Sequence, residues 1–494
     1  MRKTFMIALA AMMLLVSACT PDVPEAGMTG KPADIFPDYR DVTVPYNIAP
    51  LNFEIVDDAH GKWVLKIEAG EEEHVLRPDG SVFRFGKRFW KRLLNENKGR
   101  TLTFTLYAKA EDGWLAYAPF TINVAPEDID PYLVYRKIPP GYSLWQEMGI
   151  YQRCLEDFAE KAIYRNTQGR GNCVNCHSFR DRDPQDMLFH MRSELAGTYI
   201  FRNGGKEKLN TKTDSTMSAL VYPYWHTSGR YVAFSVNRTN QVLHVRNANR
   251  IEVFDEDSDV VVYDVASHEI VTTPFLKADD AFETFPTFSP DGRSLYFCSA
   301  RAVKPMPERF KEARYSLCRV DFNPSDCTFG DKVDTLYNAV TSGGSVSFPR
   351  VSPDGRFLVY TLSGYGNFSI WHKDADLCCI DLHSGETTDI SALNSDDVES
   401  YHSWSGNGRW MVFSSRRDDG LYTKPYVGYV DADGRAHKPF LLPQKEPGEY
   451  YDALMFSYNI PELVSGKVQI DGREAASFAK EGETIEVRYV NRDR

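Results

Sequence analysis

Two cysteines and a histidine stand close together in the run Gly-Asn-Cys-Val-Asn-Cys-His, which covers residues 171–177. Cys173 and Cys176 are three residues apart and His177 follows directly, which is the spacing of a c-type haem attachment motif. Two thiols at this spacing can bond the two vinyl groups of one porphyrin, while the adjacent imidazole coordinates the iron. The segment therefore predicts one covalent haem c, with Cys173 and Cys176 as attachment points and His177 as an axial ligand.

Other roles for two close cysteines are less favoured by the sequence. A zinc site needs a second ligand pair, and no other Cys-x-x-Cys occurs in the chain. A thioredoxin-like redox pair needs a strand and helix setting that the neighbouring residues do not indicate. A structural disulfide does not easily close so short a loop. Chance occurrence of the motif, in a chain with nine cysteines, stays open as the alternative.

The second axial ligand of such a haem is left open between several residues. The segment from Asp183 to Ala196 is predicted as a helix, and it carries His190 and Met191. His226 is a further candidate, because it stands where three related segments have serine. His190 and His226 are preferred, Met191 ranks below them, and a five-coordinate iron is the remaining alternative.

The N-terminus predicts an exported and lipid-anchored protein. Arg2 and Lys3 precede an apolar run from Phe5 to Val16, which is too short to span a bilayer. The following Val16-Ser17-Ala18-Cys19 resembles the bacterial lipobox. That resemblance implies a signal peptide over residues 1–18, acylation of Cys19 and attachment to a membrane of the cell envelope. The predicted location is the outer membrane, at its periplasmic face or at the cell surface.

Three folded parts are expected after a linker at residues 19–40. Residues 41–126 alternate apolar and polar side chains between turn signals and predict an N-terminal β-sandwich. Residues 127–197 are predicted as a short helical connector with the Cys-x-x-Cys-His segment, because apolar residues from Leu144 to Ala162 fall at helical spacing. Residues 198–462 are predicted as a β-propeller and residues 463–494 as a β-rich tail, so the expected fold class is mainly β.

Four segments of the 198–462 region repeat one pattern, in which an aromatic residue begins the segment and a Gly-Arg pair ends it. The segments are Tyr222 to Arg230, Phe285 to Arg293, Phe348 to Arg356 and Tyr401 to Arg409, and a β-rich run follows each. Repeated strand units cannot bury their faces alone, so they must stack or close into a ring. The sequence Ser-Pro-Asp-Gly-Arg before an apolar strand resembles the TolB-like propeller repeat. That resemblance implies a propeller, and we expect five to six blades, closed by pairing residues 198–209 with a strand near 452–458.

Composition narrows the function further. The chain has 494 residues, a net charge of −12 and 42% hydrophobic residues, which is typical of a globular protein. An acidic chain without long basic runs is not expected to bind nucleic acid, and no Gly-x-Ser-x-Gly hydrolase motif occurs. The preferred function is a lipid-anchored haem protein that transfers electrons to a redox partner, with no catalytic residue predicted. The alternative is a non-catalytic, protein-binding propeller scaffold without haem.

Overall fold

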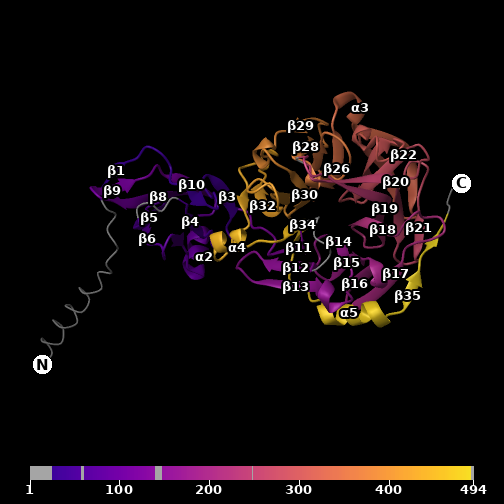
Figure 1. Cartoon of the computed structure of the whole chain (residues 1–494), viewed down its shortest axis with the longest axis horizontal. Helices are drawn as coiled ribbons and strands as arrows, with labels where there is room; N and C mark the ends of the chain where they lie inside the picture. The colour runs from indigo at the N-terminus through magenta and orange to yellow at the C-terminus, as the bar shows by residue number, and fades with distance from the viewer. Residues whose placement is uncertain (1–24, 57–60, 140–146, 248, 491–494) are drawn as a thin grey trace. The chain divides into compact units, whose positions relative to one another are not determined.

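The computed structural model of the protein describes residues 25–56, 61–139, 147–247 and 249–490. Cys19 and the predicted signal peptide lie outside these residues, so the lipid anchor stays a prediction. The described chain is mainly β, as predicted, and forms two compact units (Figure 1). We call residues 25–46, 50–126 and 443–452 the N-terminal unit, and residues 47–49, 127–442 and 453–490 the six-sheet unit. No helix in the described ranges is both long and apolar enough to cross a bilayer.

The described part of the N-terminal unit holds two sheets and two α-helices. The larger sheet contains β1 (Ala26–Met28), β3 (Val42–Pro45), β5 (Trp63–Ala69), β6 (Glu72–Leu76), β8 (Thr101–Ala110), β9 (Gly113–Ala116) and β10 (Phe120–Ala125). The smaller sheet contains β2 (Ile35–Phe36), β4 (Phe53–Ile55) and β7 (Val82–Phe83), and the helices are α2 (Lys87–Glu96) and α4 (Pro447–Asp452). Strands β1 and β2 lie within residues 19–40, so the linker prediction is wrong there. Strand β1 pairs with β9 in parallel through backbone groups. Such pairing does not depend on apolar side chains, so the polar composition of the segment did not reveal the strand.

The described residues of the six-sheet unit form six sheets of four or five strands each. Three sheets include a strand from near the C-terminus: the first has β11 (Tyr132–Ile138), β12 (Gly149–Cys154), β13 (Glu160–Arg165) and β34 (Ser457–Val464); the second has β14 (Val174–Phe179), β15 (Asp186–Met191), β16 (Gly197–Arg202), β17 (Gly205–Asn210) and β35 (Thr484–Glu486); the third has β18 (Leu220–Trp225), β19 (Tyr231–Leu243), β20 (Ile251–Asp264), β21 (Glu269–Val271) and β36 (Arg488–Tyr489). The other three sheets each consist of four consecutive strands: the fourth has β22 (Ala281–Phe288), β23 (Ser294–Arg301), β24 (Ser316–Asn323) and β25 (Thr328–Tyr337); the fifth has β26 (Ser345–Val351), β27 (Phe357–Ser363), β28 (Asp376–Asp381) and β29 (Thr387–Thr388); the sixth has β30 (Glu399–Trp404), β31 (Trp410–Ser415), β32 (Lys424–Tyr429) and β33 (Phe440–Leu441). The short helices α3 (Ala339–Ser342) and α5 (Gly472–Glu481) accompany them.

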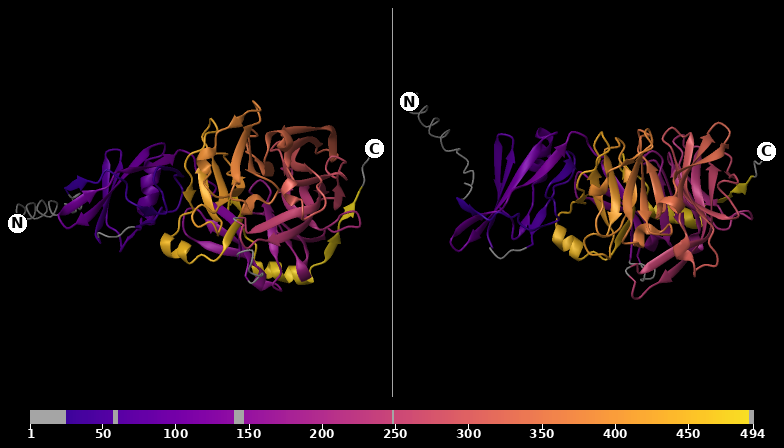
Figure 2. Two further views of the ribbon diagram at one scale, coloured as in Figure 1. Left: turned by 45° about the horizontal axis from the view of Figure 1, so that its top comes forward. Right: turned by 90° about the horizontal axis from the view of Figure 1, so that it is seen from above.

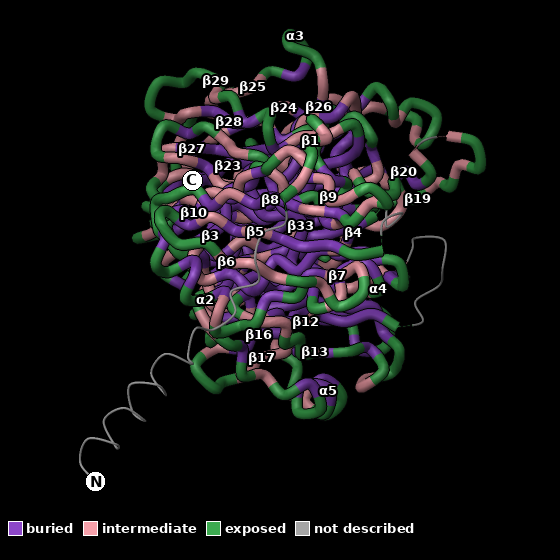
Figure 3. The backbone as a smooth tube through the Cα atoms, turned by 90° about the vertical axis from the view of Figure 1, so that its left-hand side faces the viewer, coloured by how far each residue is buried: buried purple, intermediate pink, exposed green. Residues whose placement is uncertain are grey.

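Each sheet has one strand that contacts its equivalents in the two neighbouring sheets, and we call these six the inner strands. They are β14, β18, β22, β26, β30 and β34, and β34 contacts both β30 and β14. Figure 2 shows the sheets from two further directions, with the long hairpin of β19 and β20 extending from one of them. The strands are largely buried, whereas exposed backbone gathers in turns such as the one at α3 (Figure 3).

The repeated turns have the conformation that their sequence predicts. Gly229, Gly292, Gly355 and Gly408 all have a positive φ, between 67° and 77°. In each turn the glycine N–H donates to the carbonyl oxygen three residues earlier, as from Gly292 to Ser289. The β-rich run predicted after each turn is present as β19, β23, β27 or β31. Glycine is favoured at this position because it adopts a positive φ without a Cβ penalty.

Both helices predicted around the cysteine segment are wrong. Residues 149–154 and 160–165 form strands β12 and β13, and residues 186–191 form strand β15; residues 140–146 lie outside the described part. All six residues of β15 are buried, because sheets cover it on both faces. A strand buried on both faces loses the alternation that distinguishes it from a helix, so its apolar residues can match helical spacing by coincidence.

Two other expectations about the six-sheet unit also fail. The last inner strand, β34, pairs with β11 rather than with residues 198–209, which form β16 and β17. The C-terminal tail contains the helix α5 as well as β35 and β36. The apolar face of α5, with Ala475, Ala476 and Ala479 buried, packs in the same core cluster as strands β13 to β16. Residues 127–197 therefore belong to sheets of the six-sheet unit and do not form a separate connector.

Candidate functional site

Every inner strand has a β-bulge at the same point. The pairing of each inner strand with its neighbour skips two residues, and the first of the two has a φ between 48° and 53°. We call these first residues the bulge residues: Cys176, Tyr222, Phe285, Phe348, Tyr401 and Ile460. A positive φ is uncommon outside glycine, so its recurrence at six equivalent positions marks a shared structural role.

The bulge residues meet at the centre of the six-sheet unit. The ring centroids of Tyr222 and Phe285 are 4.9 Å apart, those of Phe285 and Phe348 4.2 Å, and those of Phe348 and Tyr401 4.5 Å. Cys176 and Ile460 line the same small central space as the four aromatic residues. The bulge residues therefore separate two larger cavities that open on either side of them.

Cys176 and His177 occupy the two positions that the bulge of β14 skips. The equivalent pairs in the other five inner strands are Tyr222-Pro223, Phe285-Pro286, Phe348-Pro349, Tyr401-His402 and Ile460-Pro461. Sequence comparison identified three of them and the Tyr401-His402 variant, but not the two outer members at Cys176 and Ile460. The pair at Ile460 could have been found from the run Ile460 to Leu463, because this run has the proline and the following apolar residue of the repeat at the same spacing.

One cavity, of about 470 Å³, is lined by residues that precede the bulges, and we call it the arginine cavity. Asn175 and Cys176 from β14 and Cys173 directly before it line this cavity, together with Arg136, Arg192 and Arg416. The tip of the β19 and β20 hairpin supplies Thr239, Asn240, Gln241, Ile251 and Val253, and Phe368, Ile370 and Trp371 complete an apolar wall. No aspartate or glutamate is among the described residues that line it.

The arginines of this cavity are poorly paired. Arg136 and Arg416 are only 8% and 6% exposed, and the buried Nε of each has no hydrogen-bond partner among the described residues. Asn459 accepts from Nη2 of Arg136 at 3.3 Å in the amide orientation that satisfies its contacts. The Arg416 guanidinium lies 3.8 Å from the centroid of the Trp371 ring. Burial lowers the pKa of Arg416 to about 10 against the opposing effect of Asp397 and Asp419, so it stays cationic at neutral pH.

The second cavity, of about 250 Å³, is lined by residues that follow the bulges, and we call it the histidine cavity. His177 and His402 both line it, beside Glu462 and Arg350. The His177 side chain is fully buried, and neither of its ring nitrogens has a hydrogen-bond partner among the described residues. Its Nε2 lies 3.7 Å from Oε2 of Glu462, too far for a hydrogen bond.

Burial decides the charge state of the residues around His177. Burial and, to a lesser extent, the nearby Arg136 together lower the pKa of His177 to about 3. Burial also raises the pKa of Glu462 to about 7, although the Phe179 N–H donates to this carboxylate and Arg350 and Arg182 attract it. At neutral pH His177 is therefore an uncharged imidazole that can act as a proton acceptor or hydrogen-bond donor in the cavity.

Replacing His177 by glutamine is expected to stabilise the protein at acid pH relative to the natural chain. The unfolded histidine binds a proton below pH 6.5 but the folded one does so only near pH 3, so stability is lost as the pH falls through this range. At pH 5 the difference is about 2 kcal/mol. Chemical unfolding at pH 5 and 7.5 measures it. The exposed His383→Gln variant is the control, and equal curves for both variants would contradict the expectation.

The cysteine and histidine geometry does not fit a single covalent haem. Cys173 and Cys176 line the arginine cavity and His177 lines the histidine cavity, whereas the central space that Cys176 and His177 share measures only about 30 Å³. The described residues around the arginine cavity include no histidine or methionine that could replace His177 as an iron ligand. As the described residues are arranged, the space that Cys176 and His177 share has no room for one porphyrin bonded to both thiols and held by the His177 imidazole.

The candidate second ligands lie elsewhere. His226 belongs to the turn between β18 and β19, where its Nε2 donates to the Gly292 carbonyl oxygen at 3.0 Å and its Nδ1 accepts from the Ser228 N–H at 3.1 Å. Both nitrogens are thus engaged, and the ring packs against Tyr231 and Phe288. His226 stabilises the turn and is not placed to bind iron, which corrects the sequence-based prediction.

His190 and Met191 occupy the strand β15. His190 is buried, its Nδ1 lies 3.3 Å from Oγ1 of Thr198, and burial lowers its pKa to about 3. Met191 belongs to a hydrophobic core cluster with Met187 and Phe189. Neither residue is among those that line the two cavities.

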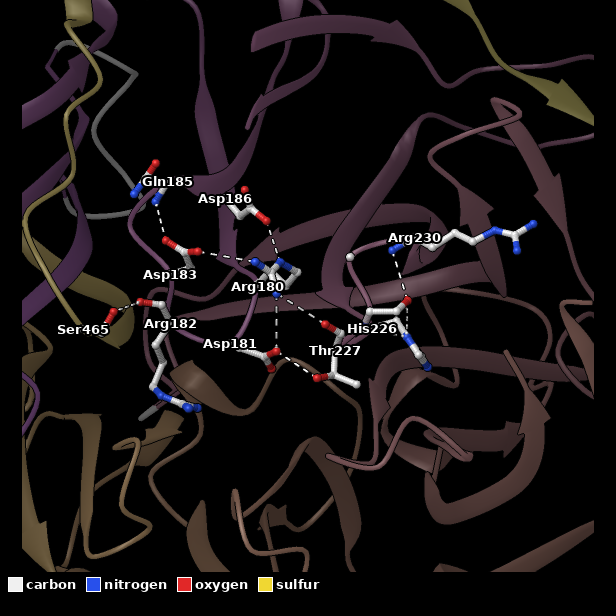
Figure 4. Close-up of polar contacts among 12 residues, drawn as sticks. Arg180, Asp181, Arg182, Asp183, Gln185, Asp186, His226, Thr227, Arg230 and Ser465 are labelled. Carbon is white, nitrogen blue, oxygen red and sulfur yellow. Dashed lines mark hydrogen bonds and ion pairs between the residues drawn. The ribbon is translucent and has the colours of Figure 1, made fainter. Parts of the chain in front are cut away.

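Charged residues of the turn after β14 form polar contacts beside the histidine cavity (Figure 4). The Arg180 Nε donates to Asp186 at 2.5 Å, and the Thr227 hydroxyl donates to Asp181 at 2.9 Å. The second contact joins this turn to the neighbouring β18–β19 turn. Asp181 and Arg182 line the cavity beside it.

Comparisons with known proteins identify similar structures but no family. No protein-family model matches the chain, and no curated protein matches it. Similar solved structures include prolyl oligopeptidase B from Galerina marginata (10% identity, TM-score 0.35, covering 68% of this chain and 41% of that chain). Another is the tricorn protease (11% identity, TM-score 0.32, covering 83% of this chain and 35% of that chain). A third is a periplasmic gluconolactonase from Pseudomonas aeruginosa (14% identity, TM-score 0.31, covering 63% of this chain and 97% of that chain). The chain spans less than half the length of the two peptidases, and similarity at this level carries no statement about function.

Proposed function

We propose that the six-sheet unit is a six-bladed β-propeller that binds a ligand in its central arginine cavity and is not a c-type haem carrier. Each of its sheets contacts the next, and β34 contacts both β14 and β30, which supports a closed ring of blades. The convergence of six bulge residues on one small central space supports the same arrangement. We propose a binding scaffold in place of the electron carrier that the sequence predicts.

One observation carries the functional part of this proposal. Neither large cavity is lined by all three motif residues, the central space that Cys176 and His177 share is only about 30 Å³, and Cys176-His177 stands at the position of an aromatic-proline pair. The Cys-x-x-Cys-His spacing then does not mark a haem site. Export and lipid attachment at Cys19 remain part of the proposal and rest on the resemblance of residues 16–19 to the lipobox.

The absorption spectrum of the purified protein tests the absence of haem. We expect no c-type pyridine-haemochrome band when the chain is exported in cells that contain the haem attachment machinery, because the space that Cys176 and His177 share is too small for a porphyrin. A known c-type cytochrome matured in the same cells is the positive control. A stoichiometric c-type band that disappears in the Cys176→Ala variant would overturn the proposal and restore the electron carrier.

A further inference from the structure

We propose that the arginine cavity binds a small organic anion, whose carboxylate or phosphate is held by Arg136, Arg192 and Arg416 and whose apolar part lies against Phe368, Ile370 and Trp371. This inference rests on the proposed function and names its ligand class. It follows from the charge of the cavity, the state of its arginines and the chemistry of its walls.

The charge of the cavity is opposite to that of the protein. The whole chain carries a net charge of −12, yet the described lining of the arginine cavity contains three arginines and no acidic residue. Concentrated positive charge with low-dielectric walls raises the local concentration of anions. A cation would be repelled from this site, and a neutral ligand would bring no opposite charge to the three guanidinium groups.

Two of these arginines are buried at a free-energy cost that a ligand can offset. A buried charged group without a hydrogen-bonding partner is unfavourable, and Nε of Arg136 and Nε of Arg416 have none among the described residues. A guanidinium presents paired N–H donors that match carboxylate and phosphate oxygens. Arg192 is exposed and lies between β15 and the turn at Ser193–Leu195, so it can contact an acidic group that enters the cavity.

The apolar residues that line the arginine cavity indicate that the part of the ligand beyond its acidic group is apolar. Apolar side chains from three parts of the chain line the cavity beside the arginines: Ile251 and Val253 from β20, Ile138 from β11, and Phe368, Ile370 and Trp371 from the segment before β28. Asn175, Asn240 and Gln241 add amide groups, and Oδ1 of Asn175 is buried without a partner among the described residues. A volume of about 470 Å³ is within the range of small-molecule sites.

Isothermal titration calorimetry of the whole purified protein at constant ionic strength tests the inference. The probes are two pairs, inorganic phosphate with phenyl phosphate and acetate with benzoate, so that the arms separate phosphate from carboxylate recognition. We expect at least one of the aromatic anions to bind, and to bind more tightly than its small counterpart, because its ring buries apolar surface. No binding of either aromatic anion would overturn the inference.

Arginine variants locate the binding. Arg136→Gln, Arg192→Gln and Arg416→Gln are each expected to weaken binding of the aromatic anion about 10-fold or more, because each removes a charged hydrogen-bond donor. Arg301→Gln removes the same charge from an exposed position outside the cavity and is expected to leave the affinity unchanged. Arg192 is exposed, so its variant tests the site even if the buried variants fail to fold. Equal affinity of Arg192→Gln and the natural protein would overturn the inference, whereas a c-type haem spectrum would overturn the proposed function itself.

Discussion

Replacing Gly292 by alanine is expected to lower the free energy of unfolding by about 4 kcal/mol. The φ of Gly292 is +70°, and a Cβ added there would lie 2.1 Å from Nε2 of His226. The left-handed conformation alone costs an L-residue about 1–2 kcal/mol. The remainder arises because His226 must move, which breaks its bond to the Gly292 carbonyl oxygen and disturbs its packing against Tyr231, Phe288 and Phe322.

A matched control exists in the next repeat. Gly355 has a φ of +77° in the equivalent turn, and a Cβ there would meet no atom within 4 Å, so Gly355→Ala is expected to cost only about 1–2 kcal/mol. Urea unfolding of the two variants measures the difference. In the His226→Ser background, which restores the serine of the other three repeats, Gly292→Ala is expected to cost no more than Gly355→Ala. A Gly292→Ala variant as stable as Gly355→Ala in the natural background would contradict the steric explanation.

Replacing Glu462 by glutamine is expected to stabilise the protein by about 3 kcal/mol at pH 8 and by almost nothing at pH 4. Burial raises the pKa of this carboxyl from 4.5 to about 7, so the folded protein holds the proton more tightly than the unfolded chain. The natural protein therefore loses stability as the pH rises from 4.5 to 7. Glutamine cannot ionise, and its amide oxygen can still accept from the Phe179 N–H, so the variant avoids this loss.

Unfolding curves of the natural chain and the Glu462→Gln variant at several pH values between 4 and 8 test this dependence. The difference between them is expected to grow with pH and to level off above pH 7. Glu386→Gln, at an exposed position between β28 and β29, is the control and is expected to give a difference that does not change with pH. A constant difference for Glu462→Gln as well would show that the buried carboxyl does not take up a proton on folding.

The repeated turns could be predicted from the sequence because their chemistry is local. A Pro-Asp-Gly step specifies a tight turn by the backbone preferences of three adjacent residues, and Gly292 and Gly355 adopt the positive φ that those preferences require. The strands around the cysteine segment could not be predicted in the same way. Residues of β12 and β15 are buried on both faces by neighbouring sheets, and that burial depends on contacts far along the chain.

The candidate site could be predicted only in part for the same reason. Cys173, Cys176 and His177 were identified from their spacing, but spacing does not show on which side of a bulge each side chain lies. The three arginines of the cavity stand at positions 136, 192 and 416, in or beside strands of three different sheets. No local pattern joins them, and only the arrangement of inner strands places them around one space.

The pairing of β34 with β11 has a consequence for the order of folding. These strands are joined by hydrogen-bonded partners as distant in sequence as Tyr132 and Val464, so the first sheet of the six-sheet unit stays incomplete until nearly the whole chain has been synthesised. Contacts between such distant residues require a costly loop closure, and proteins rich in them fold slowly. Until then β11 presents an unpaired edge, which is a template for association with other chains. The first sheet of the six-sheet unit can therefore be completed only after residue 464 has been synthesised, and β34 sets the time at which that edge is protected.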